Sequence, residues 1–228
     1  MAEELRLSEQ EKVRRGKMED LRAKGLDPFG HKFVRTSNSG KLKEEYLECS
    51  KEELEEKNVE VSIAGRIMSK RRQGKIGFMH IQDREGKIQI FMRADSVSED
   101  DYELFKVADI GDIIGITGIV MKTQTGELSV KATKYTHLSK ALRPLPEKFH
   151  GLQDREEARR RRYVDLIMNE EARRIAYLRP RIIRGLQKYL DDLGYIEVET
   201  PVLSPILGGA SARPFVTHHN TLDMDFYL

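Results

Sequence analysis

The chain has 228 residues, of which 39% are hydrophobic and 34% are charged, so it can bury one or two domain cores but is too polar to be all core. Its formal net charge is only +2, so affinity for nucleic acid has to come from local basic patches, such as Lys70–Lys75 and Arg155–Arg162. The single cysteine, Cys49, excludes a disulfide framework, and the absence of zinc spacing argues against a structural metal. A charged amino terminus and the lack of a long apolar run favour a cytoplasmic protein.

The first predicted element is a helix within residues 1–30. Ser8 and Glu11 have the spacing of a capping box, and Gly25 is a stop signal. The apolar stripe of this helix is thin, with Val13, Met18 and Leu21, and most other positions are basic. Two interpretations are open: a solvated surface helix, or a helix that contacts the backbone of an RNA.

From Val59 onward, apolar residues alternate with period two in short runs that are separated by glycine-containing turns. The runs cover residues 59–72, 75–83, 86–93, 110–123 and 126–138. Between the third and fourth runs, Ser98 begins a helical pattern that includes Tyr102 and Phe105. Three strands, a helix and two strands are the order of an OB-fold, a five-stranded barrel that binds oligonucleotides through strands 2 and 3. We place this domain at residues 31–142.

The alternation of side chains along each strand predicts the outer face of the barrel. The side chains expected there are Arg66, Phe78, His80, Gln82, Lys87, Gln89, Phe91, Arg93 and Glu127. Such a face suits unstacked bases, because an aromatic ring stacks on a base with about 1–3 kcal/mol and polar groups hydrogen-bond to base edges. The alternative is that Phe78 or Phe91 packs beneath another part of the chain.

After the barrel, Pro144 and Pro146 interrupt regular structure and an arginine-rich helix follows, which predicts an interdomain linker at residues 143–168. A longer helix begins with Asn169 as its cap. Its apolar residues Ile175, Leu178, Ile182, Leu186, Tyr189 and Leu193 share one stripe. This stripe is a packing face, and Pro180 within the helix predicts a kink or a restart.

Residues 190–203, LDDLGYIEVETPVL, resemble motif 1 of the class II aminoacyl-tRNA synthetases, a long helix and a glycine–aromatic step before a strand that leads to Pro201. RYVDL, residues 162–166, resembles the signature before motif 1 in the subgroup with an amino-terminal OB-fold, which includes the aspartyl, asparaginyl and lysyl enzymes. The segments ALRPLPEKFHGLQD and GGASARPFVTHHNTLDMDFYL are similar to the bacterial lysyl-tRNA synthetases. The resemblance runs from the first helix to the last residue.

This resemblance implies an α+β protein with an N-terminal helix, a five-stranded OB-fold barrel and, at residues 169–228, the beginning of an antiparallel class II catalytic domain. It implies a lysine–tRNA ligase, which activates lysine with ATP and Mg²⁺ and transfers it to tRNA-Lys. The family is homodimeric through motif 1, which would place Pro201 at the dimer interface. Its OB-fold reads a uridine-rich anticodon.

In the barrel, the resemblance implies that Phe78 stacks on a base while Arg66, Gln89 and Glu127 contact base edges, and the strand alternation places all four outside. The basic residues Lys70, Arg71 and Arg72 are expected to contact the tRNA backbone, since phosphate contacts act through charge.

In the second domain, the turn formed by Gly208, Gly209 and Ala210 resembles the segment that lines the lysine pocket, where bare backbone can approach a substrate. A plain tight turn is the alternative. His218 and His219 resemble a histidine pair of the family, and their spacing indicates neither a metal site nor acid–base chemistry.

Class II chemistry also needs motif 2, an Arg-x-Glu hairpin that holds ATP, and motif 3, a Gly-x-Gly-x-x-Arg segment that supports the triphosphate. Neither follows motif 1 in this sequence. Without these arginines the charge on the phosphates is not stabilised, so we expect no catalytic residue in this chain and no tight binding of ATP or Mg²⁺. We interpret the chain as the amino-terminal part of a synthetase. The alternative is a non-catalytic OB-fold module for tRNA or single-stranded nucleic acid.

Overall fold

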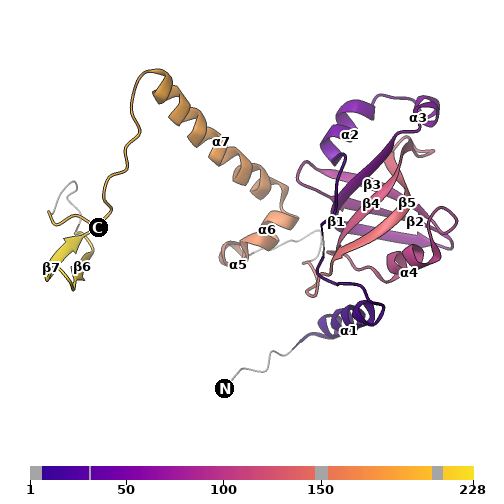
Figure 1. The fold of residues 1–228 in the computed structure, drawn as a ribbon, viewed down its shortest axis with the longest axis horizontal. Helices are drawn as coiled ribbons and strands as arrows, with labels where there is room; N and C mark the ends of the chain where they lie inside the picture. Colours follow the sequence, from indigo (N-terminus) through magenta and orange to yellow (C-terminus); the bar gives the residue numbers. More distant parts are fainter. Residues whose placement is uncertain (1–6, 31, 147–153, 207–212) are drawn as a thin grey trace. The chain divides into compact units, whose positions relative to one another are not determined.

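A computed structural model describes residues 7–30, 32–146, 154–206 and 213–228 of the chain (Figure 1). The chain divides into two compact units, Met1–Phe149 and His150–Leu228. The first unit contains a closed barrel with helices around it, and the second contains a long helix and a short β-hairpin.

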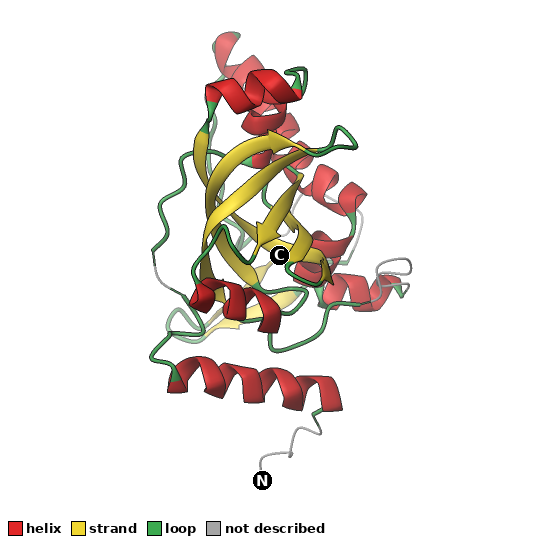
Figure 2. Ribbon diagram, turned by 90° about the vertical axis from the view of Figure 1, so that its right-hand side faces the viewer, coloured by secondary structure: helices red, strands yellow, loops and turns green. Residues whose placement is uncertain are grey.

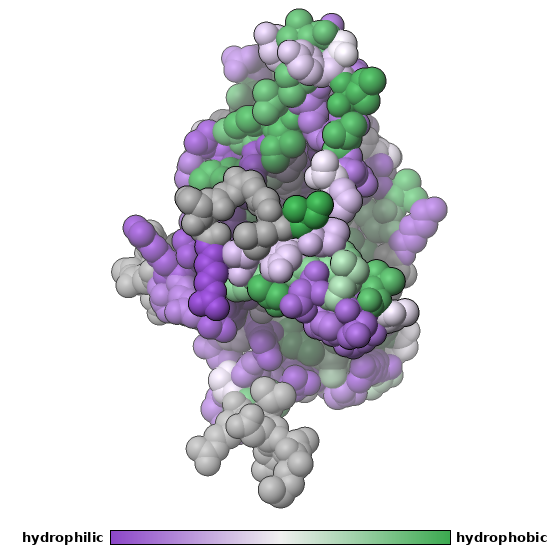
Figure 3. Space-filling view, turned by 90° about the vertical axis from the view of Figure 1, so that its left-hand side faces the viewer, coloured by the Kyte–Doolittle hydropathy of each residue, from purple (hydrophilic) through white to green (hydrophobic). Residues whose placement is uncertain are grey.

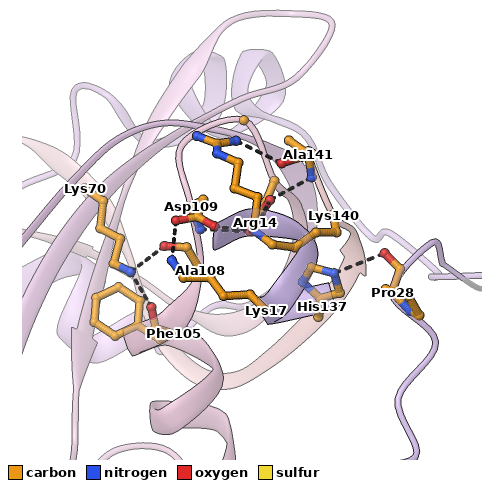
Figure 4. Close-up of polar contacts among 12 residues, drawn as sticks. Arg14, Lys17, Pro28, Lys70, Phe105, Ala108, Asp109, His137, Lys140 and Ala141 are labelled. Carbon is orange, nitrogen blue, oxygen red and sulfur yellow. Dashed lines mark hydrogen bonds and ion pairs between the residues drawn. The ribbon is translucent and has the colours of Figure 1, made fainter. Parts of the chain in front are cut away.

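Helix α1, Glu9–Ala23, has the predicted capping box, in which the Ser8 side chain accepts from the Glu11 backbone N–H and the Glu11 carboxylate accepts from the Ser8 N–H. The helix is not a freely solvated basic surface. The Arg14 guanidinium donates to the carbonyl of Ala141 at 2.9 Å, and the Lys17 ammonium pairs with a carboxylate of the barrel. Two of its basic side chains therefore anchor α1 to the barrel (Figure 4).

The anchor continues into a buried ion cluster. Lys140, whose side chain is 2% exposed, contacts Asp109 at 2.6 Å and the fully buried Asp112 at 2.8 Å. Lys17 of α1 contacts the same Asp109 carboxylate at 2.6 Å. The hydrogen bonds from Lys140 and Lys17 lower the pKa of Asp109 even though its burial acts in the opposite direction. The cluster thus joins α1, the segment before β4 and the end of β5.

Two short helices, α2 Ser39–Tyr46 and α3 Lys51–Lys57, precede the barrel and were not predicted. Each is shorter than two and a half turns and buries a single leucine, so it has no hydrophobic period to detect. Their sequence signals are caps: Asn38 caps α2, and Ser50 and Glu53 form a capping box for α3.

Five strands close into a barrel in the order β1-β2-β3-β5-β4, in which only the β3–β5 pair is parallel (Figure 2). The strands are β1 Glu60–Gln73, β2 Ile76–Gln82, β3 Lys87–Arg93, β4 Ile113–Lys122 and β5 Leu128–Ser139, and α4 Glu99–Val107 lies between β3 and β4 in sequence. The inward side chains, such as Ile67, Met79, Ile90 and Ile116, form the core. This arrangement confirms the predicted OB-fold.

The first strand contains a β-bulge between Ile67 and Ser69. One extra residue shifts the alternation of side chains, so positions after the bulge face the opposite way from those of a regular strand. Arg71 is paired with Phe78 on the outer face, while Lys70 turns toward the inner side. The bulge therefore decides which basic residue of this strand shares a face with the aromatic ring.

Lys70 closes the carboxyl end of α4 and does not extend toward solvent (Figure 4). Its ammonium donates to the carbonyl oxygens of Phe105 at 2.6 Å, Lys106 at 3.0 Å and Ala108 at 2.7 Å. These carbonyls belong to the last turn of the helix, where no backbone donor is available to them. Burial lowers the pKa of Lys70 to about 8. The donors of Lys70 are therefore used inside the fold, and its predicted contact with the tRNA backbone stays a prediction.

The second unit contains α5 Arg155–Arg160, α6 Arg162–Met168, α7 Glu170–Asp192 and the antiparallel strands β6 Val216–His219 and β7 Met224–Tyr227. Asn169 caps α7 as predicted, and Pro180 lies inside one uninterrupted helix, so the predicted restart is absent. The strand expected before Pro201 is not formed, because residues 195–201 have no ladder partner in the described part of the chain. Within the described ranges, no helix is both long and apolar enough to cross a membrane.

Candidate nucleic-acid interface

The outer face of the barrel contains a hollow of about 1170 Å³. Residues of all five strands line it together with α3 and the turn between β4 and β5. Its basic residues are Lys51, Arg71, Arg72, Arg93, Lys122 and Lys131, and its acidic residues are Glu55 and Glu127. Since six basic side chains stand against two acidic ones, the hollow favours a polyanion although the whole chain is nearly neutral.

Two aromatic rings lie next to each other in this hollow. Phe78 of β2 and Phe91 of β3 are directly paired across the sheet, with ring centroids 5.2 Å apart and planes inclined by 42°. Both rings are half-buried, so neither is covered completely by another part of the chain. At this separation a base does not fit between them, and stacking is available only on a ring side that faces the hollow.

A chain of hydrogen bonds crosses the outer face next to the rings. Ser69 Oγ lies 3.0 Å from Nδ1 of His80, and Nε2 of His80 lies 2.9 Å from Oε1 of Glu127. The Gln89 amide donates to Oε2 of Glu127 at 2.6 Å, and Ser129 Oγ donates to Oε1 of Gln89 at 2.8 Å. These contacts connect four strands, β1, β2, β3 and β5, with the β4–β5 turn and hold the Glu127 carboxylate at the edge of the hollow.

Of the predicted base-edge residues, the structure brings Gln89 and Glu127 together and leaves Arg66 elsewhere. Gln89 is 5% exposed, because Ser129 and Glu127 cover its amide. The Glu127 side chain is 46% exposed and keeps free acceptor capacity toward the hollow. Arg66 does not line the hollow, and its half-buried guanidinium donates to the Gly111 carbonyl at 2.7 Å.

Arg71 is the base-edge candidate that the sequence did not indicate. It lines the hollow opposite Phe78 and makes no hydrogen bond or ion pair with the described residues. Arg72 lines the same hollow and also has no hydrogen bond or ion pair within that part of the chain. The sequence shows both residues only as members of a basic run, and the bulge that places Arg71 beside Phe78 has no sequence signal of its own.

The remaining predicted site residues belong to the second unit. Gly208, Gly209 and Ala210, which the resemblance relates to a lysine pocket, lie outside the described residues. Pro201 is exposed.

The histidine pair of the hairpin makes local contacts. Nδ1 of His218 lies 3.0 Å from Asp225 across the hairpin, and the His219 ring lies 5.6 Å from the ring of Phe226. Among the described residues, no three His, Cys, Asp or Glu side chains are grouped so that they could hold a metal ion.

The barrel and its hollow define an OB-fold protein, and residues 61–138 match the family described as OB-fold nucleic acid binding domain. Residues 154–228 match the family described as tRNA synthetases class II (D, K and N). The chain therefore belongs to the class II tRNA synthetases of this group.

Within that group, the chain is similar to curated lysine–tRNA ligases. The chain is 58% identical to those of Bacillus cytotoxicus and Bacillus cereus strain AH187 over 97% of its length. It is 58% identical to that of Lactococcus lactis subsp. cremoris over 100% of its length. It covers only 44% of the two Bacillus proteins and 46% of the Lactococcus protein, so the chain spans less than half the length of these relatives.

Proposed function

We propose that this chain is part of a lysine–tRNA ligase and that the hollow on its barrel binds unstacked uridine bases of the tRNA-Lys anticodon. One observation carries the proposal: the Phe78–Phe91 pair, Arg71 and Glu127 line the same hollow. An aromatic surface binds any base, whereas the charged groups beside it select among the bases.

The two charged side chains match the edge of uracil. Uracil presents an N3–H donor between two carbonyl oxygens, so a carboxylate such as Glu127 can accept from N3–H while a guanidinium such as Arg71 donates to a carbonyl. Cytosine has an unprotonated N3 at this position, which a carboxylate repels. Arg72 and Lys131 also line the hollow and can contact the phosphates. Phosphate contacts position the RNA strand but do not read its sequence.

Titration of the chain with a uridine-rich anticodon stem-loop tests this proposal directly. We expect binding that weakens when uridines are replaced by cytidines and that weakens for every sequence as salt concentration rises. Equal affinity for the two stem-loops would contradict base readout in the hollow and leave only a general polyanion site.

The activity of the whole ligase is part of the same proposal: lysine is activated with ATP and Mg²⁺ and transferred to tRNA-Lys in the cytoplasm. The match of residues 154–228 to the class II enzymes supports it over a non-catalytic OB-fold module. Because the motif 2 and motif 3 arginines do not follow motif 1 in the sequence, the 228-residue chain should bind the stem-loop without lysine-dependent exchange of pyrophosphate into ATP. Exchange above background would refute this division of roles.

The proposal also includes a homodimer formed through α7. Six apolar residues of one stripe, namely Ile175, Leu178, Ile182, Leu186, Tyr189 and Leu193, are between 38% and 61% exposed in the single chain. Hydrophobic side chains gather on the surface of the second unit (Figure 3). A contiguous apolar surface of this kind is typical of a protein interface, and motif 1 supplies it in this family.

A further inference from the structure

His80 belongs to the hydrogen-bond chain beside the hollow, and the proposed function gives it no role. It lies on the outer face of β2, where it is paired with Gln89 of β3 and with Ser69 of β1. Nε2 of His80 lies 2.9 Å from Oε1 of Glu127, and Nδ1 lies 3.0 Å from Ser69 Oγ. Both ring nitrogens therefore have a partner.

The chemistry of these partners determines where the protons lie. An ionised carboxylate only accepts hydrogen bonds, so the contact with Glu127 requires a proton on Nε2 of His80. In the neutral imidazole Nδ1 is then an acceptor, and the Ser69 hydroxyl donates to it. On the other side, Ser129 donates to the Gln89 carbonyl oxygen at 2.8 Å, which turns the Gln89 amide N–H toward Glu127. Each oxygen of the Glu127 carboxylate thus receives one fixed donor.

Among the described residues, no further hydrogen bond or ion pair restrains the Glu127 side chain. The residue ends the turn Thr123–Glu127, and its backbone N–H donates to Thr123 Oγ1 at 3.1 Å. Its side chain is 46% exposed, and a long exposed side chain loses conformational entropy when it is held in one rotamer. The hydrogen bonds from His80 of β2 and Gln89 of β3 compensate for this loss before any ligand binds. The Glu127 acceptor is therefore preorganised.

We infer that His80 is a positioning residue, which holds the Glu127 carboxylate as a fixed acceptor and so makes the hollow prefer a base with an imino N–H, uracil, over cytosine. The inference rests on the proposed function, because it concerns the selectivity of the same hollow. His80 itself does not contact the base. Its effect is on the ratio of the affinities for uracil and cytosine, and its loss leaves stacking on Phe78 and the phosphate contacts unchanged.

Two near-isosteric variants separate the contacts of His80. His80→Gln places an amide N–H near the position of Nε2 and keeps the hydrogen bond to Glu127. His80→Asn places its amide near Nδ1, so it keeps the contact with Ser69 and loses the one with Glu127. Lys87→Ala is the matched control, since Lys87 is exposed on the neighbouring strand and does not line the hollow.

The measurement is the dissociation constant of the chain for a stem-loop with three anticodon uridines and for three stem-loops with one uridine replaced by cytidine. At one of the three anticodon positions, wild type, His80→Gln and Lys87→Ala should show the same ratio of affinities for the uridine and the cytidine stem-loop. His80→Asn should lower that preference about tenfold, which is the loss expected for one hydrogen bond to a charged group, with unchanged affinity for the cytidine stem-loop and an unchanged melting temperature.

An equal loss of affinity for all stem-loops in His80→Asn would show that His80 has only a structural role and would overturn the inference. The same conclusion follows if His80→Gln behaves like His80→Asn, or if His80→Asn keeps the full preference. Wild-type chain that binds none of the stem-loops, or binds all four equally, would instead overturn the proposed function, and the inference with it. The wild-type titration therefore separates the two failures.

Discussion

Replacement of Phe78 by alanine is the most direct test of the aromatic platform. The Phe78 and Phe91 centroids are 5.2 Å apart, so a base stacks on one side of the pair and the variant loses a single stacking contact. A base–aromatic stack contributes about 1–3 kcal/mol. With one half-buried ring in use we expect the lower part of this range, about 1–2 kcal/mol, which raises the dissociation constant of the anticodon stem-loop about 5- to 30-fold.

The fold should survive this change. Phe78 points outward from β2 and is half-buried, so its truncation should cost less than the roughly 3–5 kcal/mol of a fully buried phenylalanine. Phe78→Leu is the informative companion, because it keeps apolar bulk without a π face and should bind almost as weakly as Phe78→Ala. Isothermal titration at constant salt measures both variants. A dissociation constant that does not change in a folded Phe78→Ala chain would refute the stacking argument.

Three further predictions concern the charged and apolar groups. Arg71→Ala should lower the affinity for uridine stem-loops more than the affinity for cytidine ones. Arg72→Ala should lower both affinities alike and reduce the slope of log affinity against log salt by about one. Titrations at several salt concentrations measure both effects, and identical results for the two variants would contradict this assignment. The folded chain loses the Lys70 proton near pH 8 while the unfolded chain keeps it to about 10.5, so the free energy of unfolding relative to Lys70→Met should rise between these pH values in urea titrations. A flat difference would contradict the burial of a charged Lys70. In sedimentation the chain should form dimers that Ile182→Glu dissociates, and a monomeric wild type at micromolar concentration would count against an α7 interface.

Local patterns explain why much of the barrel could be predicted. Strand alternation depends only on neighbouring residues, so it placed Phe78 and Phe91 on the outer face correctly. Helix caps are equally local, and Ser8 and Ser98 begin their helices as expected. The resemblance of the second half to the class II synthetases rests on motifs that are continuous in sequence, and the family match confirms it.

The contacts that could not be predicted are those that a residue makes with a distant segment. The donors of Lys70 are taken by carbonyls at the end of α4, about 35 residues away in sequence, and Arg66 is bonded to the carbonyl of Gly111. Gln89 lies on the predicted face and is nevertheless buried, because Glu127 of the β4–β5 turn and Ser129 of β5 cover it. None of these contacts has a periodicity that a sequence could reveal.

The sequence by itself determined the kind of protein and the residues that form the outer face of its barrel, because period, caps and motifs are properties of short segments. Only the tertiary structure decided which of these residues share one hollow. A single extra residue after Ile67 reverses the alternation and moves Arg71 to the side of Phe78. The closure of β3 against β5 then brings Gln89 to Ser129 and the adjoining Glu127, because parallel pairing joins segments that are 40 residues apart in the chain.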